Sequence, residues 1–458
     1  MSSVKAAKGT APSVLIVGGG LGGLMLGLLL ERINIPYHIF ERATEPRPLG
    51  SVMTLGPTIL PAFEQLGLLE EIEKMSLPCN SLDMYNEHME KLGAIDLTGH
   101  KAASGYENYL FARPRLYTLM LKQIPPEKIS LGKKVLRIEN KDNKIIIHCS
   151  DNTFHEGAIL VGADGAYSSV RQSLYRDLDS QGLLPKSDLE QMSIGFVGMV
   201  GVANPKNPEK YPQLKDNHSH YSQVLGPDSR SWGVFSVPGN QVCFVLGKQL
   251  SVSEAKDQTF RNSEWGPESN ESMLKEYYDL PCPWGGKMGD VFSDTPKDLI
   301  SKVFLEEKLF KTWYHGRTVL IGDACHKMLP GAGQGAVNAM QDAIVLANCF
   351  YNMTDMDSQD IDDAFKEYYR QRYPHAEVQF ARSNAMSKML SGQTWMERVV
   401  RNVMLNYMPN WVHQLSFNKT FEYRPQIAWL PLAENRGTVR LLPQEGERRL
   451  LGEMAQPA

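Results

Sequence analysis

The sequence predicts an α/β fold with a discontinuous parallel-sheet domain, an inserted antiparallel sheet and a helical carboxyl-terminal region. Three short apolar runs, at 14–17, 158–161 and 319–321, have the composition of parallel strands buried on both faces. Four runs within 186–289 alternate apolar and polar side chains between turn-forming residues, as antiparallel strands do. Beyond residue 360 the apolar residues follow a helical period. We therefore expect two kinds of sheet in one chain.

The composition narrows the possible classes of function. The 458 residues are enough for two domains and a third small one, and the formal net charge of -4 offers no basic surface for nucleic acid. The six cysteines show neither CxxC nor Cys/His ligand spacing. We therefore expect no metal site and no disulfide framework, which fits a reducing compartment.

The apolar stretch Ser13–Leu30 raises the alternative of a membrane or targeting segment. A spanning helix needs about 20 mostly apolar residues, whereas this stretch is shorter, is interrupted by glycines and runs into Glu31. No small-residue cleavage site follows it. The sequence thus predicts no signal peptide and no transmembrane helix. It predicts a cytoplasmic protein.

The same stretch fits a strand, a glycine turn and a buried helix. Gly18, Gly20 and Gly23 follow the first apolar run as GxGxxG; they permit a tight turn, approach of the backbone to a pyrophosphate, and close helix–strand packing, respectively. Glu41 lies 18 residues after Gly23, where an acidic side chain binds a ribose and repels a 2′-phosphate. The motif predicts a Rossmann-like site for the adenosine half of FAD or NAD. Taken alone, it also fits a glycine-rich turn with an unrelated glutamate.

Two further motifs place carboxylates at strand ends. Asp164 follows the run at 158–161 and precedes a helix start, although an isolated Asp-Gly pair is more often a turn. Asp323 follows the run at 319–321 and precedes a glycine-bearing loop and a long apolar helix. Such a carboxylate can accept a hydrogen bond from a hydroxyl, and the helix N-terminus can donate to an electron-rich oxygen.

Cys325-His326 could suggest a nucleophile–base pair or two metal ligands. Adjacent residues on an extended loop point apart, and the sequence offers no third partner. We therefore expect neither role.

In this order and spacing, GxGxxG with Glu41, "GADGAYSSVR" and "GDACHKMLPGAGQGAVNAMQDA" resemble the single-component FAD-dependent aromatic hydroxylases and epoxidases of the p-hydroxybenzoate hydroxylase type. Arg113 and Leu116 fit the R-x-x-L segment of that family, and the stretch 50–68 is also similar. The resemblance spans roughly residues 12 to 385, and the segment 427–444 is similar to the tails of fungal biosynthetic members.

The resemblance implies a role for each matching residue. The three glycines would hold the FAD pyrophosphate, Glu41 and Arg42 would lie at the adenosine, and Arg113 and Asp323 near the ribityl chain or pyrophosphate. Asp164 would serve both FAD and a transient nicotinamide. The flavin ring would be met by a set of loop and helix-start residues, namely Pro330, Gly333, Gly335 and Ala336. No protein residue is assigned as catalytic, because the flavin carries the chemistry.

The implied activity is an FAD- and NAD(P)H-dependent monooxygenase that uses O2. It would hydroxylate or epoxidise a hydrophobic or aromatic small molecule through a flavin C4a-hydroperoxide, in meroterpenoid, polyketide or alkaloid biosynthesis. Because the chain has no second GxGxxG unit, NADPH or NADH would dock transiently. An FAD-dependent reductase, a halogenase and a non-catalytic nucleotide-binding protein remain alternatives, although Trp232 and Trp284 do not form the WxWxIP motif of tryptophan halogenases.

The resemblance also divides the chain. The expected FAD domain comprises 11–80, 105–185 and 290–390, the substrate domain comprises 81–104 and 186–289, and the helical region and tail comprise 391–458. Five apolar residues of the substrate domain could line a pocket or simply form core, namely Phe196, Met199, Tyr221, Trp232 and Phe235. The segment 265–286 has the composition of a surface excursion.

The carboxyl-terminal region is predicted to be helical, with a break or kink at Pro374. The amphipathic stretch 394–417 combines methionines, tryptophans and arginines. We interpret it as core packing, with peripheral contact to a membrane as the alternative. The oligomeric state stays open.

Overall fold

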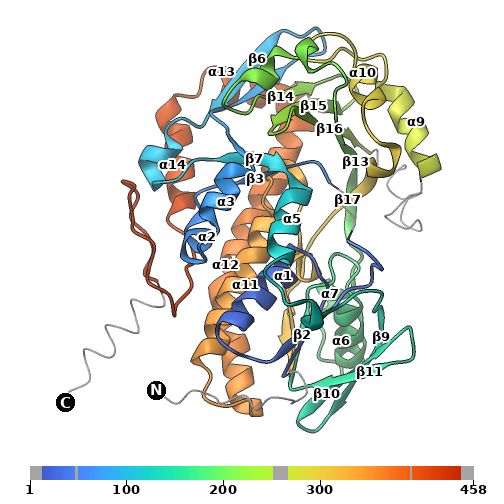
Figure 1. Cartoon of the computed structure of the whole chain (residues 1–458), viewed down its shortest axis with the longest axis vertical. Helices are drawn as coiled ribbons and strands as arrows, with labels where there is room; N and C mark the ends of the chain where they lie inside the picture. Colours follow the sequence, from blue (N-terminus) through green and yellow to red (C-terminus); the bar gives the residue numbers. More distant parts are fainter. Residues whose placement is uncertain (1–12, 47–49, 251–266, 392–394, 445–458) are drawn as a thin grey trace.

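The computed structural model describes residues 13–46, 50–250, 267–391 and 395–444. The parts of the expected domains and tail at 11–12, 47–49, 251–266, 392–394 and 445–458 lie outside the described residues. The described chain forms a parallel sheet at one end and a larger antiparallel sheet at the other, with long helices running between them (Figure 1). The α/β fold predicted from the sequence is confirmed.

The first sheet has six strands in the order β18-β19-β12-β1-β2-β8, and only β18 runs antiparallel to its neighbour. The bounds are β1 Val14–Val17, β2 Tyr37–Phe40, β8 Ile129–Ser130, β12 Ile159–Gly162, β18 Tyr314–His315 and β19 Thr318–Leu320. β1 has the predicted bounds, and β12 and β19 are offset from theirs by one residue. All residues of β1, β12 and β19 are buried, as parallel strands covered on both faces require.

Five longer helices surround this sheet: α1 Leu21–Arg32, α5 Arg113–Leu121, α6 Ser169–Ser180, α11 Gly335–Asn352 and α12 Ser358–Ser391. Helices α1 and α11 pack closely, because Gly22 has no side chain and a Cβ there would lie 3.2 Å from that of Ala339. Helix α12 continues through Pro374, so of the predicted break or kink the break is wrong and the kink stays a prediction. Burial of Tyr368, Arg372 and Ala376 on both sides of the proline holds the two halves in place.

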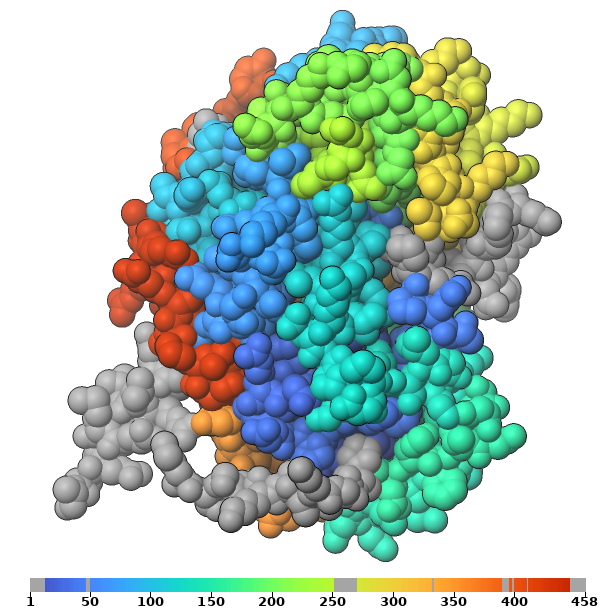
Figure 2. All heavy atoms as spheres, in the orientation of Figure 1, coloured from blue at the N-terminus to red at the C-terminus, as the bar shows by residue number. Residues whose placement is uncertain are grey.

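The second sheet has eight strands in the order β20-β17-β13-β16-β15-β14-β5-β6, with only β14 and β5 parallel. Its strands are β5 Ser81–Tyr85, β6 Lys91–Asp96, β13 Ser193–Ala203, β14 Tyr221–Leu225, β15 Arg230–Val237, β16 Gln241–Gln249, β17 Ser301–Leu309 and β20 His326–Lys327. In Figure 2 this sheet fills the green and yellow end of the molecule, above the blue and teal atoms of the parallel-sheet end. The four strands predicted within 186–289 are confirmed.

Helices α9 Pro267–Tyr277 and α10 Met288–Ser293 cover one face of the second sheet. Tyr277, Cys282 and Trp284 are buried there, so the described part of 265–286 belongs to the core and the expected surface excursion is wrong. The apolar side of α9 shields Trp232, which explains why an amphipathic segment lies against the sheet.

Smaller elements connect these layers. Two three-stranded sheets comprise β3 Val52–Leu55, β4 Leu77–Pro78 and β7 Tyr109–Ala112, and β9 Val135–Lys141, β10 Lys144–Cys149 and β11 Phe154–Gly157. The short helices are α2 Leu60–Gln65, α3 Leu69–Lys74, α4 His100–Ser104 and α7 Lys186–Leu189. Helices α13 Trp395–Asn406 and α14 Asn410–Phe421 follow α12, and residues 422–444 then run back along the body.

The described helices include none with both the length and the apolar character needed to cross a bilayer.

Candidate active site

The carboxyl ends of four neighbouring strands meet at one edge of the parallel sheet. β2, β1, β12 and β19 lie side by side in this order and run in the same direction. The next residues along the chain are Glu41, Gly18, Ala163-Asp164 and, two residues beyond Ile321, Asp323. Ligands of open α/β sheets bind at such an edge, where the strand order reverses. The three sequence motifs therefore converge on one crevice.

The glycine turn after β1 has little spare space at two positions and open space at a third. Gly18 has a φ of +109°, and a Cβ there would lie 2.3 Å from the carbonyl oxygen of Ala163. A Cβ on Gly23 would lie 2.1 Å from the carbonyl oxygen of Gly18. By contrast, a Cβ on Gly20 would meet nothing within 4 Å. Gly20 also begins α1 without a side-chain cap, so the helix N-terminus faces open space that suits a pyrophosphate.

Glu41 lies against the glycine turn. Its Oε2 accepts a hydrogen bond from the backbone N–H of Gly19 at 2.7 Å, and its Oε1 accepts one from Ala43 at 2.8 Å. These bonds fix the carboxylate and leave further lone pairs on both oxygens for hydroxyl donors. Arg42 is exposed beside it. Glu41 is thus fixed at the carboxyl end of β2, beside the glycine turn.

The two carboxylate oxygens of Asp164 have different surroundings. Its Oδ2 accepts hydrogen bonds from the N–H of Ser169 at 2.7 Å, the hydroxyl of Ser169 at 3.0 Å and the N–H of Val170 at 3.2 Å. These bonds cap α6. Its Oδ1 is buried and has no partner among the described residues, so this carboxylate retains an acceptor that a bound group would satisfy.

A second charged group lies further along the crevice. Asp323 accepts a hydrogen bond from Lys327 at 2.7 Å, and this carboxylate raises the pKa of Lys327. Desolvation lowers the pKa of Arg113 and Asp323 opposes the shift, yet the Arg113 side chain stays accessible to solvent, as a group lining an open site would. Tyr117 interacts electrostatically with both Glu41 and Arg113, which links the two parts of the crevice.

The loop after Asp323 leads into the N-terminus of α11. Pro330 and Gly333 are exposed, and Gly333 has a φ of +63°. A Cβ on Gly335 would lie 3.9 Å from Oδ1 of Asp323, so the helix start is close to that carboxylate. Helix α11 has no side-chain cap hydrogen bond at its start, where Gly335 and Ala336 present backbone N–H groups. This arrangement can bind an electron-rich oxygen.

Behind the loop, three fully buried side chains form one network. Nε2 of His326 lies 2.5 Å from Oδ2 of Asp342, and Nε of Arg372 lies 2.7 Å from its Oδ1. The N–H of Gly322 donates to Oδ2 of the same carboxylate at 2.8 Å. Asp342 therefore ties the loop to α11 and α12.

This network corrects one expectation from the sequence. The donor atoms of Cys325, His326 and Asp342 lie within 4.8 Å of one another, so His326 does have a third partner. The thiol of Cys325 donates to the carbonyl oxygens of Leu320 and Gly322, and burial raises its pKa well above the usual value. A protonated, enclosed thiol is a poor nucleophile and a poor metal ligand. The group is structural.

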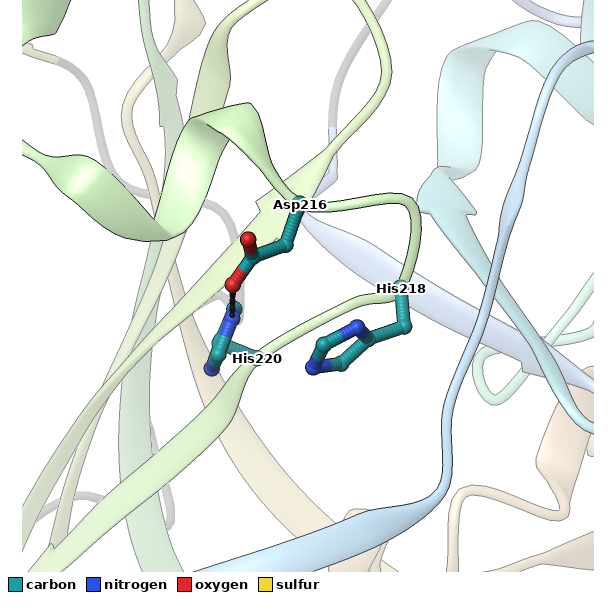
Figure 3. Close-up of side chains that lie close together, drawn as sticks. All are labelled: Asp216, His218 and His220. Atoms are coloured by element: carbon teal, nitrogen blue, oxygen red, sulfur yellow. Dashed lines mark hydrogen bonds and ion pairs between the residues drawn. The ribbon is translucent and has the colours of Figure 1, made fainter.

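A second group of possible ligands lies on the loop before β14. Oδ2 of Asp216 lies 2.7 Å from Nε2 of His220, and the ring of His218 lies 4.7 Å from that of His220 (Figure 3). Ser219, between the two histidines, is buried and donates to the carbonyl oxygen of Ser236 at 2.6 Å. The bond between Asp216 and His220, together with that of Ser219, holds the loop in place, and we assign this group a structural role.

The five apolar residues suggested as pocket lining lie in three locations. Met199 and Trp232 belong to the core under α9 and α10. Tyr221 and Phe235 lie on the opposite face with Ala112 and Val52, toward the parallel-sheet end. Phe196 is partly exposed on β13. The second pair packs beside Ala112, which directly precedes Arg113 in the chain.

A family profile described as an FAD binding domain matches residues 12–197 and 244–383 of this chain. The chain is 25% identical over 437 residues to the FAD-dependent monooxygenase penE of Penicillium thymicola, which covers 92% of this chain and 87% of that protein. The chain belongs to the family of FAD-dependent monooxygenases. FAD is the cofactor of this family, and the unpartnered oxygen of Asp164 and the open space at Gly20 fit it.

A further relative and two solved structures are also similar to this chain. The chain is 29% identical over 362 residues to the FAD-dependent monooxygenase paxM of Penicillium paxilli, covering 74% of this chain and 69% of that protein. Among solved structures, Klebsiella pneumoniae HpxO in complex with FAD and uric acid has a TM-score of 0.73 at 18% identity, covering 90% of this chain and 97% of that one. CtdE in complex with FAD and a substrate has a TM-score of 0.65 at 15% identity, covering 89% and 97%. These structures share the fold.

Sequence reasoning missed Lys327, Asp342 and Arg372. An acidic residue within the apolar run "NAMQDAIVLA" was the available signal for Asp342, because a charged side chain on a buried helix face needs a partner. The spacing of Lys327, four residues after Asp323, gave no reliable signal, because the two residues do not share a helix. Arg372 gave no such signal, since its partner lies 30 residues away in the sequence.

Proposed function

We propose that this family member uses FAD and a transiently bound NAD(P)H to insert one oxygen atom of O2 into a hydrophobic or aromatic small molecule. The relatives from Penicillium and Aspergillus, named as FAD-dependent monooxygenases, support a place in fungal secondary metabolism. The observation that carries the proposal is the convergence of Gly18, Glu41, Asp164 and Asp323 at four adjacent strand ends. The division into FAD and substrate domains is part of the same proposal.

Each residue of the crevice has a proposed task toward FAD. The glycine turn and the start of α1 hold the pyrophosphate, and Glu41 with Arg42 holds the adenosine ribose. Arg113 and Asp323 bind the ribityl chain, with Lys327 fixing the Asp323 carboxylate. Pro330 and the N–H groups of Gly333, Gly335 and Ala336 meet the pyrimidine edge of the ring.

When bound and reduced, the flavin supplies the activation of O2 and the transfer of one oxygen atom. The protein then has to position the substrate and exclude water. Tyr221 packs against the buried ring of Phe235, with ring centroids 4.5 Å apart, and its partly exposed ring offers apolar surface for this purpose. The N-terminus of α11, which has no side-chain cap, would stabilise negative charge on the pyrimidine edge of a bound flavin.

The nicotinamide needs a docking place beside the crevice. A cavity of about 510 Å³ opens beyond Asp164 and is lined by Tyr167, Arg171, Arg176 and Glu306, among others. Tyr167 donates to Glu306 at 2.6 Å across it. Arg176 is exposed in this lining and can pair with a phosphate of a dinucleotide, whereas Arg171 is buried and donates to the carbonyl oxygens of Ala166 and Ala324. We place the transient NAD(P)H there.

The test begins with the FAD-loaded protein under anaerobic conditions. We expect NADPH or NADH to bleach the flavin absorbance, faster when a substrate from a panel of aromatic and prenylated compounds is present, and air to restore it with uptake of oxygen. The product made under 18O2 should gain one labelled atom. Reduction by neither nucleotide would refute the nicotinamide part, and a reduced product without label would favour the reductase alternative.

A further inference from the structure

Helices α13 and α14 expose a run of large apolar side chains. Eight of them have exposed fractions between 48% and 74%. We call this set the outer apolar face; it comprises Trp395, Met396, Val399, Val400, Val403, Tyr407, Trp411 and Leu415. The two helices follow one another at one margin of the molecule (Figure 1). Single exposed apolar residues are ordinary, but eight within 21 positions mark a site of interaction.

The opposite sides of the same helices are packed on the body. Leu405 of α13 lies against β6, where a Cβ on Gly93 would be 2.8 Å from that of Leu405. The rings of Phe417 and Phe421 in α14 lie 4.4 and 4.9 Å from the ring of His100. The helices are therefore docked by one face and present the other outward. The side chains of the outer apolar face are therefore not the ones that pack the helices on the body.

The composition of the segment favours a lipid surface as the occupant. Residues 395–421 contain three basic residues, Arg398, Arg401 and Lys419, and a single acidic one, Glu397, whereas the whole chain has a net charge of -4. A locally basic segment in an acidic protein is complementary to anionic headgroups. Trp395, Tyr407 and Trp411 combine an apolar ring with a polar group, which suits the boundary between headgroups and acyl chains.

We propose that the outer apolar face is a peripheral membrane-binding surface that inserts into the headgroup layer of an anionic bilayer. The described helices cannot cross a membrane, so we expect α13 and α14 to lie on its surface. The proposal is independent of the substrate proposed above, since it rests on α13 and α14 alone.

The test uses the full, FAD-loaded chain and flotation with two kinds of vesicle, phosphatidylcholine alone and phosphatidylcholine mixed with phosphatidylserine. We expect binding to the mixed vesicles, weaker binding to the neutral ones, and partial release by salt. The double variant Trp395→Ser/Trp411→Ser should weaken binding at least about tenfold, because burying one large apolar side chain is worth more than a factor of ten in a binding constant.

A matched control is available on the far part of the protein. Leu136 on β9 and Phe154 on β11 are 62% and 67% exposed, close to the 62% and 68% of Trp411 and Trp395. The variant Leu136→Ser/Phe154→Ser should bind vesicles within about twofold of the parent. Both variants should keep the flavin spectrum and the melting temperature of the parent, because the changed side chains are exposed.

Three outcomes would overturn the proposal. The first is no binding of the parent protein to either vesicle, and the second is an equal loss of binding in the control variant. The third comes from sedimentation velocity: a parent dimer that the tryptophan variant dissociates, without vesicle binding, would assign the face to contact between two copies of the chain.

Discussion

Asp342 shows how one residue can join segments that are distant in the sequence. Its two oxygens are shared between His326, Arg372 and the N–H of Gly322, all in the interior. The ion pair with Arg372 has no access to solvent, so each charge depends on the other for compensation. Asp164 differs, because one of its oxygens has no partner within the described part of the chain. The carboxylates of this region therefore divide into one that holds the loop and one that remains open to a ligand.

We predict that Asp342→Asn lowers the free energy of unfolding by about 3–5 kcal/mol, because it leaves the Arg372 charge buried without its partner. Denaturant unfolding of the FAD-free protein measures this. The matched control is Asp362→Asn, which removes an exposed ion pair with Lys366 and should change the value by less than about 1 kcal/mol. Equal effects of the two substitutions would show that the buried pair adds nothing.

His375 gives a pH-dependent contribution to stability. Its ring stacks on Tyr423 with a centroid distance of 3.5 Å, and burial together with Arg372 lowers its pKa to about 4. The unfolded chain, with a pKa near 6.5, binds the proton first as pH falls. The stabilisation is therefore complete above pH 6.5 and is lost between there and about pH 4.

We expect His375→Phe to keep the ring stack and to remove this part of the pH dependence, which amounts to at most about 3 kcal/mol. Unfolding free energies of the parent and the variant, measured from pH 7 downward, should differ by an amount that changes over this interval. Two curves that stay parallel would contradict the assignment.

At the level of elements, the turn between β1 and α1 contains two glycines that are needed for different reasons. Gly23 is needed by the protein itself, because a side chain there would strike the Gly18 carbonyl. When no cofactor is bound, Gly20 has room for a side chain, and its φ of -74° suits any residue. The space beside it is used only when a phosphate comes close to the backbone.

This difference predicts opposite behaviour for two alanine substitutions. Gly23→Ala should destabilise the FAD-free protein by about 1–3 kcal/mol through the backbone clash. Gly20→Ala should change that stability by less than about 1 kcal/mol yet weaken FAD binding at least tenfold, as fluorescence titration would show. Normal FAD affinity in Gly20→Ala would place the pyrophosphate elsewhere.

Sequence patterns predicted the elements whose causes are local. Val14–Val17 is a strand with the predicted bounds, because a buried apolar run before a glycine turn has few other solutions. The continuity of α12 through Pro374 could not be predicted, since it depends on Arg372 and its distant partner Asp342. The position of Asp323 at the crevice followed from its strand, but the partner Lys327 depends on side-chain geometry that a spacing does not fix.

At the scale of the whole molecule, the carboxyl-terminal segment binds to parts of the chain that are distant in the sequence. Arg424 is 1% exposed and donates to the carbonyl oxygens of Phe421 and Ser104, each at 2.6 Å, and of Val439 at 3.3 Å. Gln65 of α2 bonds in turn to the backbone of Ile427. Segments more than 300 residues apart in the sequence are thereby held together.

We predict that Arg424→Met lowers the unfolding free energy by about 1–3 kcal/mol, since it leaves buried carbonyl groups without a donor. The exposed Arg440 on the same segment supplies the control, and Arg440→Met should have an effect within about 0.5 kcal/mol. Calorimetry of both variants distinguishes them. A parent-like transition in Arg424→Met would mean that this segment unfolds separately from the body.

The path of the chain between the two sheets has a consequence for its biosynthesis. β1 emerges from the ribosome first, but its neighbour β12 ends at residue 162 and the next strand, β19, only at residue 320 of 458. β5 and β6 are likewise made long before β14, which pairs with β5. The nascent polypeptide must carry unpaired strand edges through most of its translation. Such edges invite wrong pairing, so we expect its yield in cells to depend on chaperones that bind extended apolar segments during synthesis.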